Sequence, residues 1–394
     1  VWAKGSGGRL NMEKMSYTGY AKTYSASDFV TDSAASGTAL ASGVKTYNRS
    51  IGLSYKKFDK KKKSRPLETI IDVMKSHGKS VGVITTARVT HATPACFFAH
   101  VEDRWMENEI ASQVQNSKLD LLMGGGRRHF LPEKDAVKEE LNHYGIRKDS
   151  RNIIKELKSD HWSIIQNKNE MNQFNLKSKE SRLVALFSDK HMTYEATKRT
   201  RKDLNEPTLT EMVNFSLEFL SDNKKGFFLV IESGRIDHAS HENNVKDMLE
   251  ETLELDNCLG KLLSQGKLKN TLIVLTADHE TGGYAASGYG DVLKTRGEEF
   301  LKTKKGKYGK KYNYSSWATG PGSSEGGNQS FSANKTVEAN HTAVDVPILA
   351  SGPGAYLFTG FIENTQIPRK IMSLFGYQYK NSANYENPEK IRPQ

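Results

Sequence analysis

Residues 227–241 read FFLVIESGRIDHASH, and this stretch indicates the class of fold. Its first five residues are apolar and form a run that is typical of a strand buried on both faces. Glu232 closes the run, and Asp237 and His241 follow four residues apart, so both would project from one face of a helix. A buried strand that leads through polar residues into a helix is the repeating unit of a parallel sheet covered by helices.

The same pattern recurs along the 394 residues. Apolar runs predict further strands at Ser80–Thr85, Leu119–Met123, Leu183–Phe187, Thr271–Leu275 and Val346–Ala350. Helical periodicity lies between them at Pro66–His77, Thr208–Ser221 and Val245–Leu263. We therefore expect an α/β fold, a three-layer α/β/α sandwich with a mostly parallel central sheet, with residues 1–394 as one catalytic domain. Residues 284–338 are rich in Gly, Ser, Lys and Tyr with little periodicity, which predicts an insertion over the rim of the active site.

The composition excludes several classes of protein. Only Cys96 and Cys258 are present, which excludes a framework of several disulfides and a zinc cluster built on cysteines. No stretch approaches about 18 consecutive apolar residues, so we expect no transmembrane segment. The net charge is +11, and much of the excess lies in two lysine-rich stretches, Lys56–Arg65 and Lys302–Lys311. Little aromatic interleaving favours solvated loops over a nucleic-acid site, and a polyanion-binding protein stays an alternative.

Acidic residues and histidines gather near the ends of the predicted strands, where open parallel sheets bind their ligands. Besides the residues of the opening stretch, Asp278-His279 follows one strand and His341 precedes another. Carboxylates and imidazoles without thiolates are the ligand set of a hydrolytic rather than a structural zinc site. The remaining histidines have no such company, and we interpret them as structural: His77, His129, His143, His161 and His191.

Ser33 begins a segment of small residues that can be helical as far as Gly43. A serine at a helix N-terminus meets free backbone N–H groups and the positive end of the helix dipole, which suits a bound phosphate. The simpler alternative is that Asp32 or Ser33 only caps the helix. No Gly-x-Ser-x-Gly elbow surrounds Ser33, so a metal is the better candidate for activating its hydroxyl. Arg104 could clamp two phosphate oxygens through its planar guanidinium.

Taken in order, several segments resemble the alkaline phosphatase family. Phe29–Tyr47 (FVTDSAASGTALASGVKTY) is similar to the family's nucleophile segment. His91–Ala95 (HATPA), followed by Ala99-His100 and Arg104, resembles the segment with a magnesium-site threonine and the phosphate-binding arginine. The resemblance covers nearly the whole chain except residues 284–338, and its other segments are Leu122–Phe130, Arg182–Ser188, Phe227–His241, Thr276–His279 and Asn340–Thr342.

The resemblance implies hydrolysis of small phosphate monoesters with broad specificity, through a phosphoserine intermediate at a site with two Zn²⁺ and one Mg²⁺. Ser33 would be the catalytic nucleophile, and Arg104 would bind the substrate phosphate. The implied metal ligands are Asp237, His241 and His341 at the first zinc, Asp278 and His279 at the second, and Thr93 and Glu232 at the magnesium. The residues that would support these ligands are Asp32, His91 and His238.

Two departures from the family pattern matter. The family carries an Asp-Gly-Met-Gly loop after its first strand, with an aspartate shared between the second zinc and the magnesium, and Val1 lies downstream of the matching region. We therefore expect a signal segment, a strand and this loop to precede Val1 in the complete protein. His91 stands where some members carry aspartate and others histidine, so Zn²⁺ could replace Mg²⁺ at the third site.

The resemblance also implies a homodimer and an extracytoplasmic location: periplasmic, secreted or on a cell surface. Six Asn-x-Ser/Thr sequons fit export, at Asn48, Asn214, Asn313, Asn328, Asn334 and Asn340. Besides polyanion binding, two alternatives stay open. One is a catalytically impaired phosphate-binding homologue, because the loop aspartate is missing from this sequence. The other is a phosphodiesterase or sulfatase of the same superfamily, although the position of Arg104 argues against it. We expect no nucleic-acid partner.

Overall fold

The computed structural model describes residues 8–54, 64–133, 144–177, 182–201, 203–286, 304–305, 311–312, 315–322 and 331–380. Most of both lysine-rich stretches, much of the predicted 284–338 insertion and His143 lie outside these residues. Within the described helices, none is both long and apolar enough to cross a membrane.

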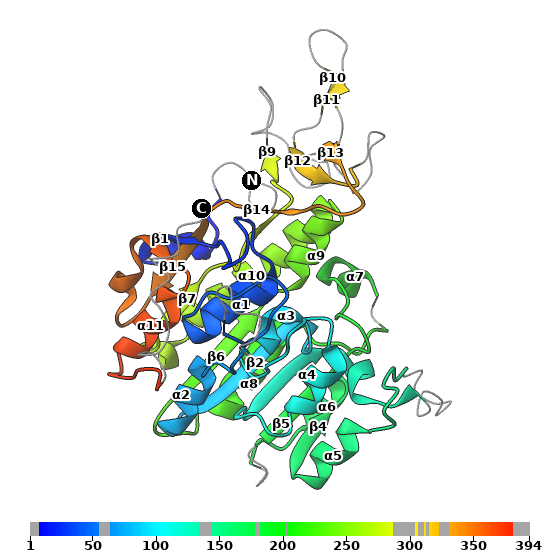
Figure 1. Ribbon diagram of the computed structural model, residues 1–394, viewed down its shortest axis with the longest axis vertical. Coiled ribbons are helices and arrows are strands. Elements are labelled where there is room, and N and C mark those ends of the chain that lie inside the picture. The colour runs from blue at the N-terminus through cyan, green and yellow to red at the C-terminus, as the bar shows by residue number, and fades with distance from the viewer. Residues whose placement is uncertain are drawn as a thin grey trace.

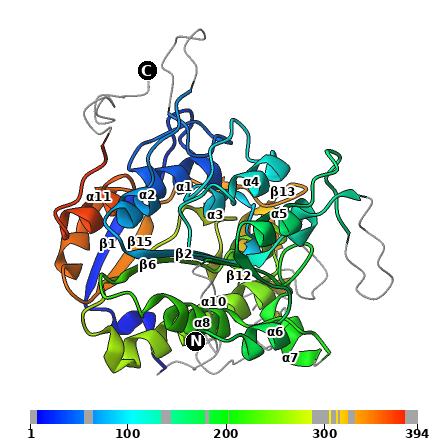
Figure 2. The same cartoon turned by 90° about the horizontal axis from the view of Figure 1, so that it is seen from below.

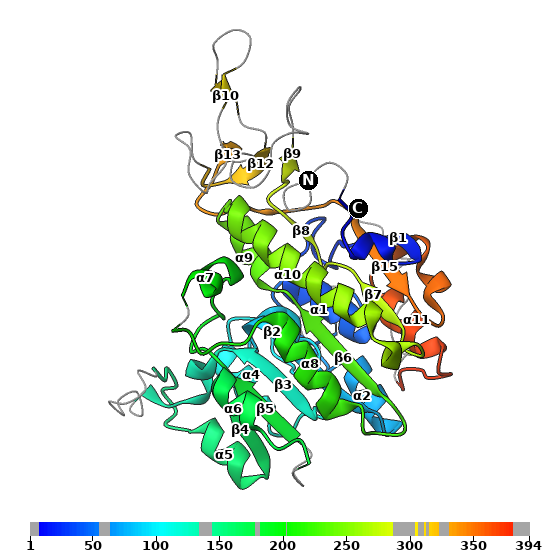
Figure 3. The ribbon, with the colours of Figure 1, turned by 180° about the vertical axis from the view of Figure 1, so that it is seen from behind.

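Five parallel strands form the larger sheet (Figure 1). In spatial order they are β4 (Trp162–Ile165), β5 (Arg182–Leu186), β3 (Leu121–Gly125), β2 (Ser80–Arg88) and β6 (Phe227–Glu232). Helices cover both faces (Figure 2). One layer contains α1 (Ser33–Ser42), α2 (Ile70–Ser76), α3 (Ala92–Ala95), α4 (Glu107–Gln113) and α5 (Ile153–Ser159). The other contains α6 (Lys168–Gln173), α7 (Glu195–Thr200), α8 (Leu209–Leu220) and α10 (Val245–Ser264), and Figure 3 shows α8 and α10 in front of the sheet, running roughly along the direction of β6. The predicted α/β class with a mostly parallel sheet is confirmed.

Alternate side chains of the parallel strands fill two separate cores. In β5, Val184 and Leu186 pack in the core shared with α2 and α5, whereas Leu183 and Ala185 pack in the core shared with α8 and α10. All four side chains are buried. Because both faces of the sheet are covered, its strands appear in the sequence as continuous apolar runs.

A second sheet has four strands, in the order β16 (Gly360–Glu363), β1 (Tyr17–Lys22), β15 (Val346–Ser351) and β7 (Ile273–Leu275). β15 pairs antiparallel with both β1 and β7, with Leu349 opposite Leu275. Helix α11 (Gln366–Ser373) contributes Ile367 to its core. The sequence predicted β7 and β15 but not β1 and β16, because β1 alternates exposed and buried residues and β16 has only two adjacent apolar residues, Phe361 and Ile362.

β6 and β7 are the facing edge strands of the two sheets, and they are not hydrogen-bonded to each other. A cavity of about 740 Å³ lies between them, lined largely by apolar residues of β6, β7 and α10. The same cavity borders Ser33, Glu232 and Asp278, so the gap between the sheets leads to the predicted site residues.

The remaining elements are short. They include η1 (Met12–Lys14), η2 (Arg127–Phe130), η4 (Gly266–Leu268), η7 (Ala355–Phe358), α9 (Arg235–His241), β8 (Glu280–Thr281) and β14 (His341–Thr342). The described part of the predicted insertion forms β9 (Ala285–Ala286), β10 (Lys304–Lys305), β11 (Lys311–Tyr312), β12 (Ser315–Gly320) and β13 (Phe331–Lys335), which stand above α9 in Figure 1. Cys96 and Cys258 are both free and buried.

Candidate active site

Ser33 is the first residue of α1, and the preceding Asp32 is its N-cap. The Asp32 carboxylate accepts the N–H of Ala35 at 2.9 Å, so Asp32 caps the helix and the Ser33 hydroxyl is left for another partner. Ser33 Oγ lies 2.9 Å from His279 Nε2, and Ser33 is 3% exposed. A buried hydroxyl at a helix N-terminus, in contact with an imidazole, is positioned to act as a nucleophile toward an anion.

Small residues allow α1 to pack closely on α3. A Cβ atom on Gly37 would lie 3.0 Å from Cys96 Sγ and 3.4 Å from the Cα atom of Thr93. Such contacts are at the limit of close packing, so a larger residue at this position would separate the helices. The glycine thereby sets the distance between the helix of Ser33 and the helix of Thr93.

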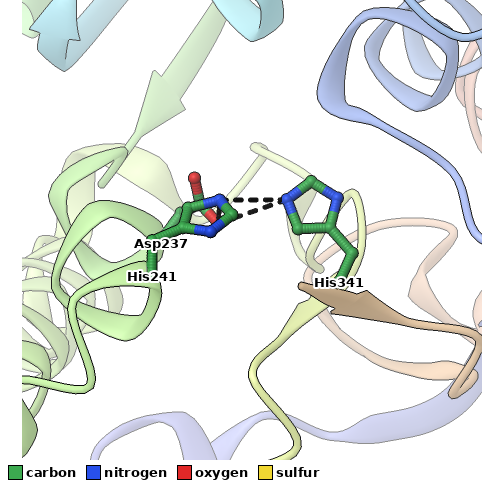
Figure 4. Close-up of side chains that lie close together, drawn as sticks. All are labelled: Asp237, His241 and His341. Atoms are coloured by element: carbon green, nitrogen blue, oxygen red, sulfur yellow. Dashed lines mark hydrogen bonds and ion pairs between the residues drawn. The ribbon is translucent and has the colours of Figure 1, made fainter. Parts of the chain in front are cut away.

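Asp237, His241 and His341 point toward one another (Figure 4). Helix α9 carries the first two, one turn apart as predicted, and β14 brings in the third. Asp237 Oδ1 lies 3.3 Å from His241 Nε2 and 3.8 Å from His341 Nε2, and the two Nε2 atoms are 3.1 Å apart. One atom from each residue lies within 4.8 Å of the others, which is compact enough for a single metal ion.

Hydrogen bonds fix which imidazole nitrogens face the centre of this cluster. His241 Nδ1 donates to the carbonyl of Ala339 at 2.6 Å, and His341 Nδ1 donates to the carbonyl of Thr31 at 2.9 Å. Because a carbonyl only accepts, both Nδ1 atoms carry protons and both Nε2 atoms are directed at Asp237. Two imidazole nitrogens and a carboxylate in such contact require a cation or an added proton between them, and this set of donors fits zinc.

The same contacts shift the pKa values of the cluster. Burial would raise the pKa of Asp237, but the hydrogen bond and charge of His241 outweigh it, and the pKa is held well below its usual range. Burial also works against the charged form of His241, yet Asp237 raises the pKa of this imidazole to about 8. Burial and the neighbouring His279 lower the pKa of His341 to about 4. An ionised aspartate therefore makes the centre of the cluster attractive to positive charge.

Asp278 and His279 follow β7, and His279 contacts Ser33. Asp278 Oδ2 is 3.3 Å from His279 Nε2 and accepts a hydrogen bond from Thr93 Oγ1 at 3.4 Å. β8 pairs antiparallel with β14, and the rings of His279 and His341 stack with centroids 3.5 Å apart. The two predicted sets of zinc ligands, which are distant in sequence, are therefore adjacent in space.

Glu232 ends β6 and borders the cavity between the sheets. Burial and the charge of Asp278 raise the pKa of Glu232 to about 7, against the hydrogen bonds that it accepts from Thr85 and Thr93. A carboxylate grouped with hydroxyl oxygens fits a hard cation such as Mg²⁺. Thr85 belongs to the apolar strand β2, so its part in this group could not be identified from local sequence.

Arg104 lies in the turn between α3 and α4, and its side chain is 11% exposed. Nη1 donates to Asp32 Oδ2 at 3.1 Å, and Nη2 lies 3.2 Å from His91 Nε2. Burial, with the charge of Arg104, lowers the pKa of His91 well below its usual range, so this imidazole is neutral and can accept. The two contacts hold the guanidinium beside the N-terminus of α1, which forms an anion site.

The interpretation of His191 as a residue without company is wrong. Its ring centroid lies 4.0 Å from that of His238 and 5.4 Å from that of His91, and the Arg88 N–H donates to its Nδ1 at 3.2 Å. Burial lowers the pKa of His238 to about 3 and that of His191 further, so these rings are neutral at pH 7. The one signal in the sequence was the position of His191 shortly after the strand that became β5.

Two further histidines have other direct partners. His77 stacks on Tyr377, with ring centroids 3.6 Å apart, and His129 Nδ1 bonds Asn108 Oδ1 at 2.9 Å. The hydroxyl of Thr281 was not anticipated as a site residue, yet it donates to Asp237 Oδ1 at 2.5 Å. Thr281 therefore helps to orient a proposed metal ligand, as a hydrogen-bonding neighbour commonly does.

Sequence comparisons point to one family. The family model described as alkaline phosphatase matches residues 4–377. The tissue-nonspecific isozyme of alkaline phosphatase from Rattus norvegicus is 32% identical over 406 residues, which span 91% of this chain and 76% of the relative. Alkaline phosphatase 4 of Bacillus subtilis is 31% identical over 374 residues, with 85% of this chain and 74% of the relative covered.

Solved structures share the fold. The alkaline phosphatase of the Antarctic bacterium TAB5 superposes with a TM-score of 0.70 and 28% identity, covering 95% of this chain and 92% of that chain. A histidine-to-glutamate variant of that enzyme, described with Mg bound in its M3 site, gives a TM-score of 0.72 at 27% identity over the same shares. The alkaline phosphatase of Thermus thermophilus gives a TM-score of 0.74 at 25% identity, covering 95% and 86% of the two chains.

Proposed function

Because this chain belongs to the alkaline phosphatase family and is a hydrolase of phosphate monoesters, we propose that its reaction passes through a phosphoserine at Ser33. The position of Ser33 Oγ carries the proposal. The hydroxyl lies 2.9 Å from Nε2 of His279, a predicted zinc ligand, at the N-terminus of α1. Transfer to Ser33 followed by transfer to water would divide the hydrolysis into two steps.

The substrate phosphate would be bound by Arg104 and by the N-terminus of α1. The guanidinium presents Nη1 and Nη2 as a planar fork that two phosphate oxygens can accept. Asp32 keeps this fork in place while it also caps α1, so one carboxylate positions both parts of the anion site. Donors that are fixed in advance stabilise the charge of the phosphoryl oxygens during transfer.

Two Zn²⁺ would be held by Asp237, His241 and His341, and by Asp278 and His279. When bound, such ions supply positive charge that lowers the pKa of coordinated hydroxyl groups and stabilises the departing oxygen. Other residues of the chain orient these ligands. The carbonyls of Ala339 and Thr31 orient two of the histidines, and the Thr281 hydroxyl orients Asp237.

A third cation, Mg²⁺, would be held by Thr93 and Glu232. The raised pKa of Glu232 supports this role, because a nearby cation would stabilise its ionised form. The TAB5 variant in which a histidine is replaced by glutamate is described with Mg bound. This supports the idea that a single side chain determines which metal binds at the third site. We propose that His91 sets this choice here and that Zn²⁺ is the alternative occupant.

The proposed site contacts the phosphate of the substrate and leaves the alcohol portion largely free. We therefore propose that the enzyme hydrolyses many small monoesters. A homodimer and an extracytoplasmic location remain part of the proposal. Self-association is supported by an exposed aromatic surface on β1 and β16, where Tyr20 stacks on Phe361 with centroids 5.3 Å apart and the two residues are 43% and 71% exposed.

Hydrolysis of 4-nitrophenyl phosphate, bis(4-nitrophenyl) phosphate and 4-nitrophenyl sulfate tests the function. We expect preference for the monoester, loss of activity with a chelator and recovery with Zn²⁺ and Mg²⁺. The Ser33→Ala variant should lose turnover, and no phosphoenzyme intermediate should be trapped with it. Ser42→Ala is the matched control, because Ser42 is also buried on α1 but lies at its far end, where its hydroxyl donates to the carbonyl of Thr38 and accepts the N–H of Val44.

The two alternatives from the same superfamily each have their own outcome in these assays. Faster cleavage of the diester or the sulfate would indicate a different member of the superfamily. Phosphate binding without turnover would indicate the impaired homologue. Activity that survives Ser33→Ala or the chelator would contradict the proposed chemistry.

A further inference from the structure

Arg49 has a left-handed backbone conformation beside the anion site, with φ of 75°. A side chain disfavours this conformation, whereas glycine adopts it freely. The backbone must nevertheless take it, because the Arg49 N–H donates to Asp32 Oδ2 at 3.0 Å and the Arg49 carbonyl accepts the N–H of Arg104 at 2.8 Å. Glycine would make both bonds without strain, so they do not explain an arginine at this position.

The ion pair of the Arg49 side chain does not explain it either. The guanidinium pairs with Asp103, but the two side chains are 60% and 32% exposed. Exposed ion pairs contribute little to stability because water screens them. Residues held in unfavourable backbone conformations cluster at functional positions, where the side chain has a task.

Trp105 is the second unusual feature of this surface. It follows Arg104 directly, is 64% exposed, and its ring centroid lies 5.6 Å from the guanidinium carbon of Arg104. Its backbone N–H donates to Asp103 Oδ1 at 3.0 Å, which ties Trp105 to the partner of Arg49. An exposed indole beside a phosphate-binding group is placed to stack on a planar part of the substrate.

We infer that Arg49 and Trp105 form a leaving-group subsite that selects nucleoside diphosphates among the phosphate substrates. The inference rests on the proposed function. The terminal phosphoryl group would occupy the site of Arg104, the inner phosphate would bind Arg49 in competition with Asp103, and the base would stack on Trp105. The subsite therefore recognises a second negative charge and a ring, neither of which a simple alkyl phosphate has.

The reaction at this subsite balances as a hydrolysis. The proton of the Ser33 hydroxyl is released to solvent. As the bond between Ser33 Oγ and the terminal phosphorus forms, the bond from that phosphorus to the bridging oxygen breaks, and its electron pair leaves with the nucleoside monophosphate. Water then breaks the bond between Oγ and phosphorus and restores the hydroxyl. The net change converts ADP and water into AMP, inorganic phosphate and a proton.

Steady-state kinetics with ADP, phosphoglycolate and ethyl phosphate test the subsite. In Arg49→Gly, the ratio of kcat/KM for ADP to that for ethyl phosphate should fall about 10-fold, mainly through KM, and phosphoglycolate should follow ADP. Arg49→Lys should retain most of the preference because it keeps the charge. In Trp105→Leu, ADP should lose about 10-fold relative to phosphoglycolate, which has no ring. Arg151→Ala is the control for charge, since the Arg151 side chain is 42% exposed, lies just before α5 and pairs with Glu156 in that helix.

Unchanged ratios in Arg49→Gly would overturn the subsite, and thermal unfolding should show that this variant is at least as stable as the wild type. Lack of hydrolysis of all three substrates by the wild type would instead contradict the proposed function. In that case the subsite is tested separately, by measuring the binding of adenosine 5′-(α,β-methylene)diphosphate, which lacks the cleavable oxygen bridge, by calorimetry. Weaker binding to Arg49→Gly than to Arg151→Ala supports it, and equal binding overturns it.

Discussion

Replacement of Arg104 by alanine is the most direct test of the anion site. The side chain is 11% exposed, and its Nη1 and Nη2 atoms contact Asp32 Oδ2 at 3.1 Å and His91 Nε2 at 3.2 Å. A phosphate that accepts both donors gains two charge-assisted hydrogen bonds, each contributing about 1.5–3 kcal/mol. Part of that gain is offset because the guanidinium and the phosphate both lose hydrogen bonds to water on binding. We therefore expect a net loss of about 3–4 kcal/mol in Arg104→Ala, or roughly 10²–10³-fold in kcat/KM.

The assay is kcat/KM for 4-nitrophenyl phosphate together with the inhibition constant of inorganic phosphate. Both should worsen, because Arg104 would bind the ground state as well as the transition state. Arg104→Lys keeps the charge but not the planar fork, so it should recover only part of the loss. Arg151→Ala should match the wild type and thereby controls for net charge. A loss below about fivefold in a folded Arg104→Ala protein, with phosphate inhibition unchanged, would refute this account of the site.

Three further predictions concern packing, protonation and the third metal. Gly37→Val should destabilise the protein by about 1–3 kcal/mol in urea unfolding and should lower kcat, because a Cβ atom at this position would lie 3.0 Å from Cys96 Sγ. Gly37→Ala should reduce the free energy of unfolding by less. Burial and the charge of Glu195 raise the pKa of Glu251 from 4.5 to about 7. The free energy of unfolding should therefore fall by about 3 kcal/mol as the pH rises from below 4.5 through 7. Calorimetric unfolding across this pH range should show the decrease in the wild type but not in Glu251→Gln. His91→Asp adds a carboxylate near Thr93 and Glu232, so the metal content after dialysis should shift from Zn²⁺ toward Mg²⁺; unchanged content would exclude His91 as the selector.

Much of the architecture was predictable because buried parallel strands have a distinctive local pattern. The six apolar runs all became strands, four of them in the five-stranded sheet and two in the four-stranded sheet. The pattern failed for β4, β1 and β16. In each of these strands glycine or polar residues interrupt the apolar side chains, so no continuous apolar run forms.

The candidate site was only partly predictable for a related reason. Asp237 and His241 share one helix, and Asp278 and His279 are neighbours in sequence, so each pair is recognisable locally. His191, Thr85 and Thr281 became neighbours of the site only because separate strands end at the same edge of the fold. Contacts between residues distant in sequence leave no local periodicity to detect.

The sequence by itself determined the class of fold, the order of the chemical groups along the chain and the helix that begins at Ser33, because hydrophobic periodicity and helix capping act over a few residues. Only the tertiary structure decided that the Ser33 hydroxyl contacts His279. It also decided that β14 pairs with β8, which brings His341 to Asp237 and His241. These contacts join segments that are far apart in the chain, and their loop-closure entropy is offset only when the whole core packs.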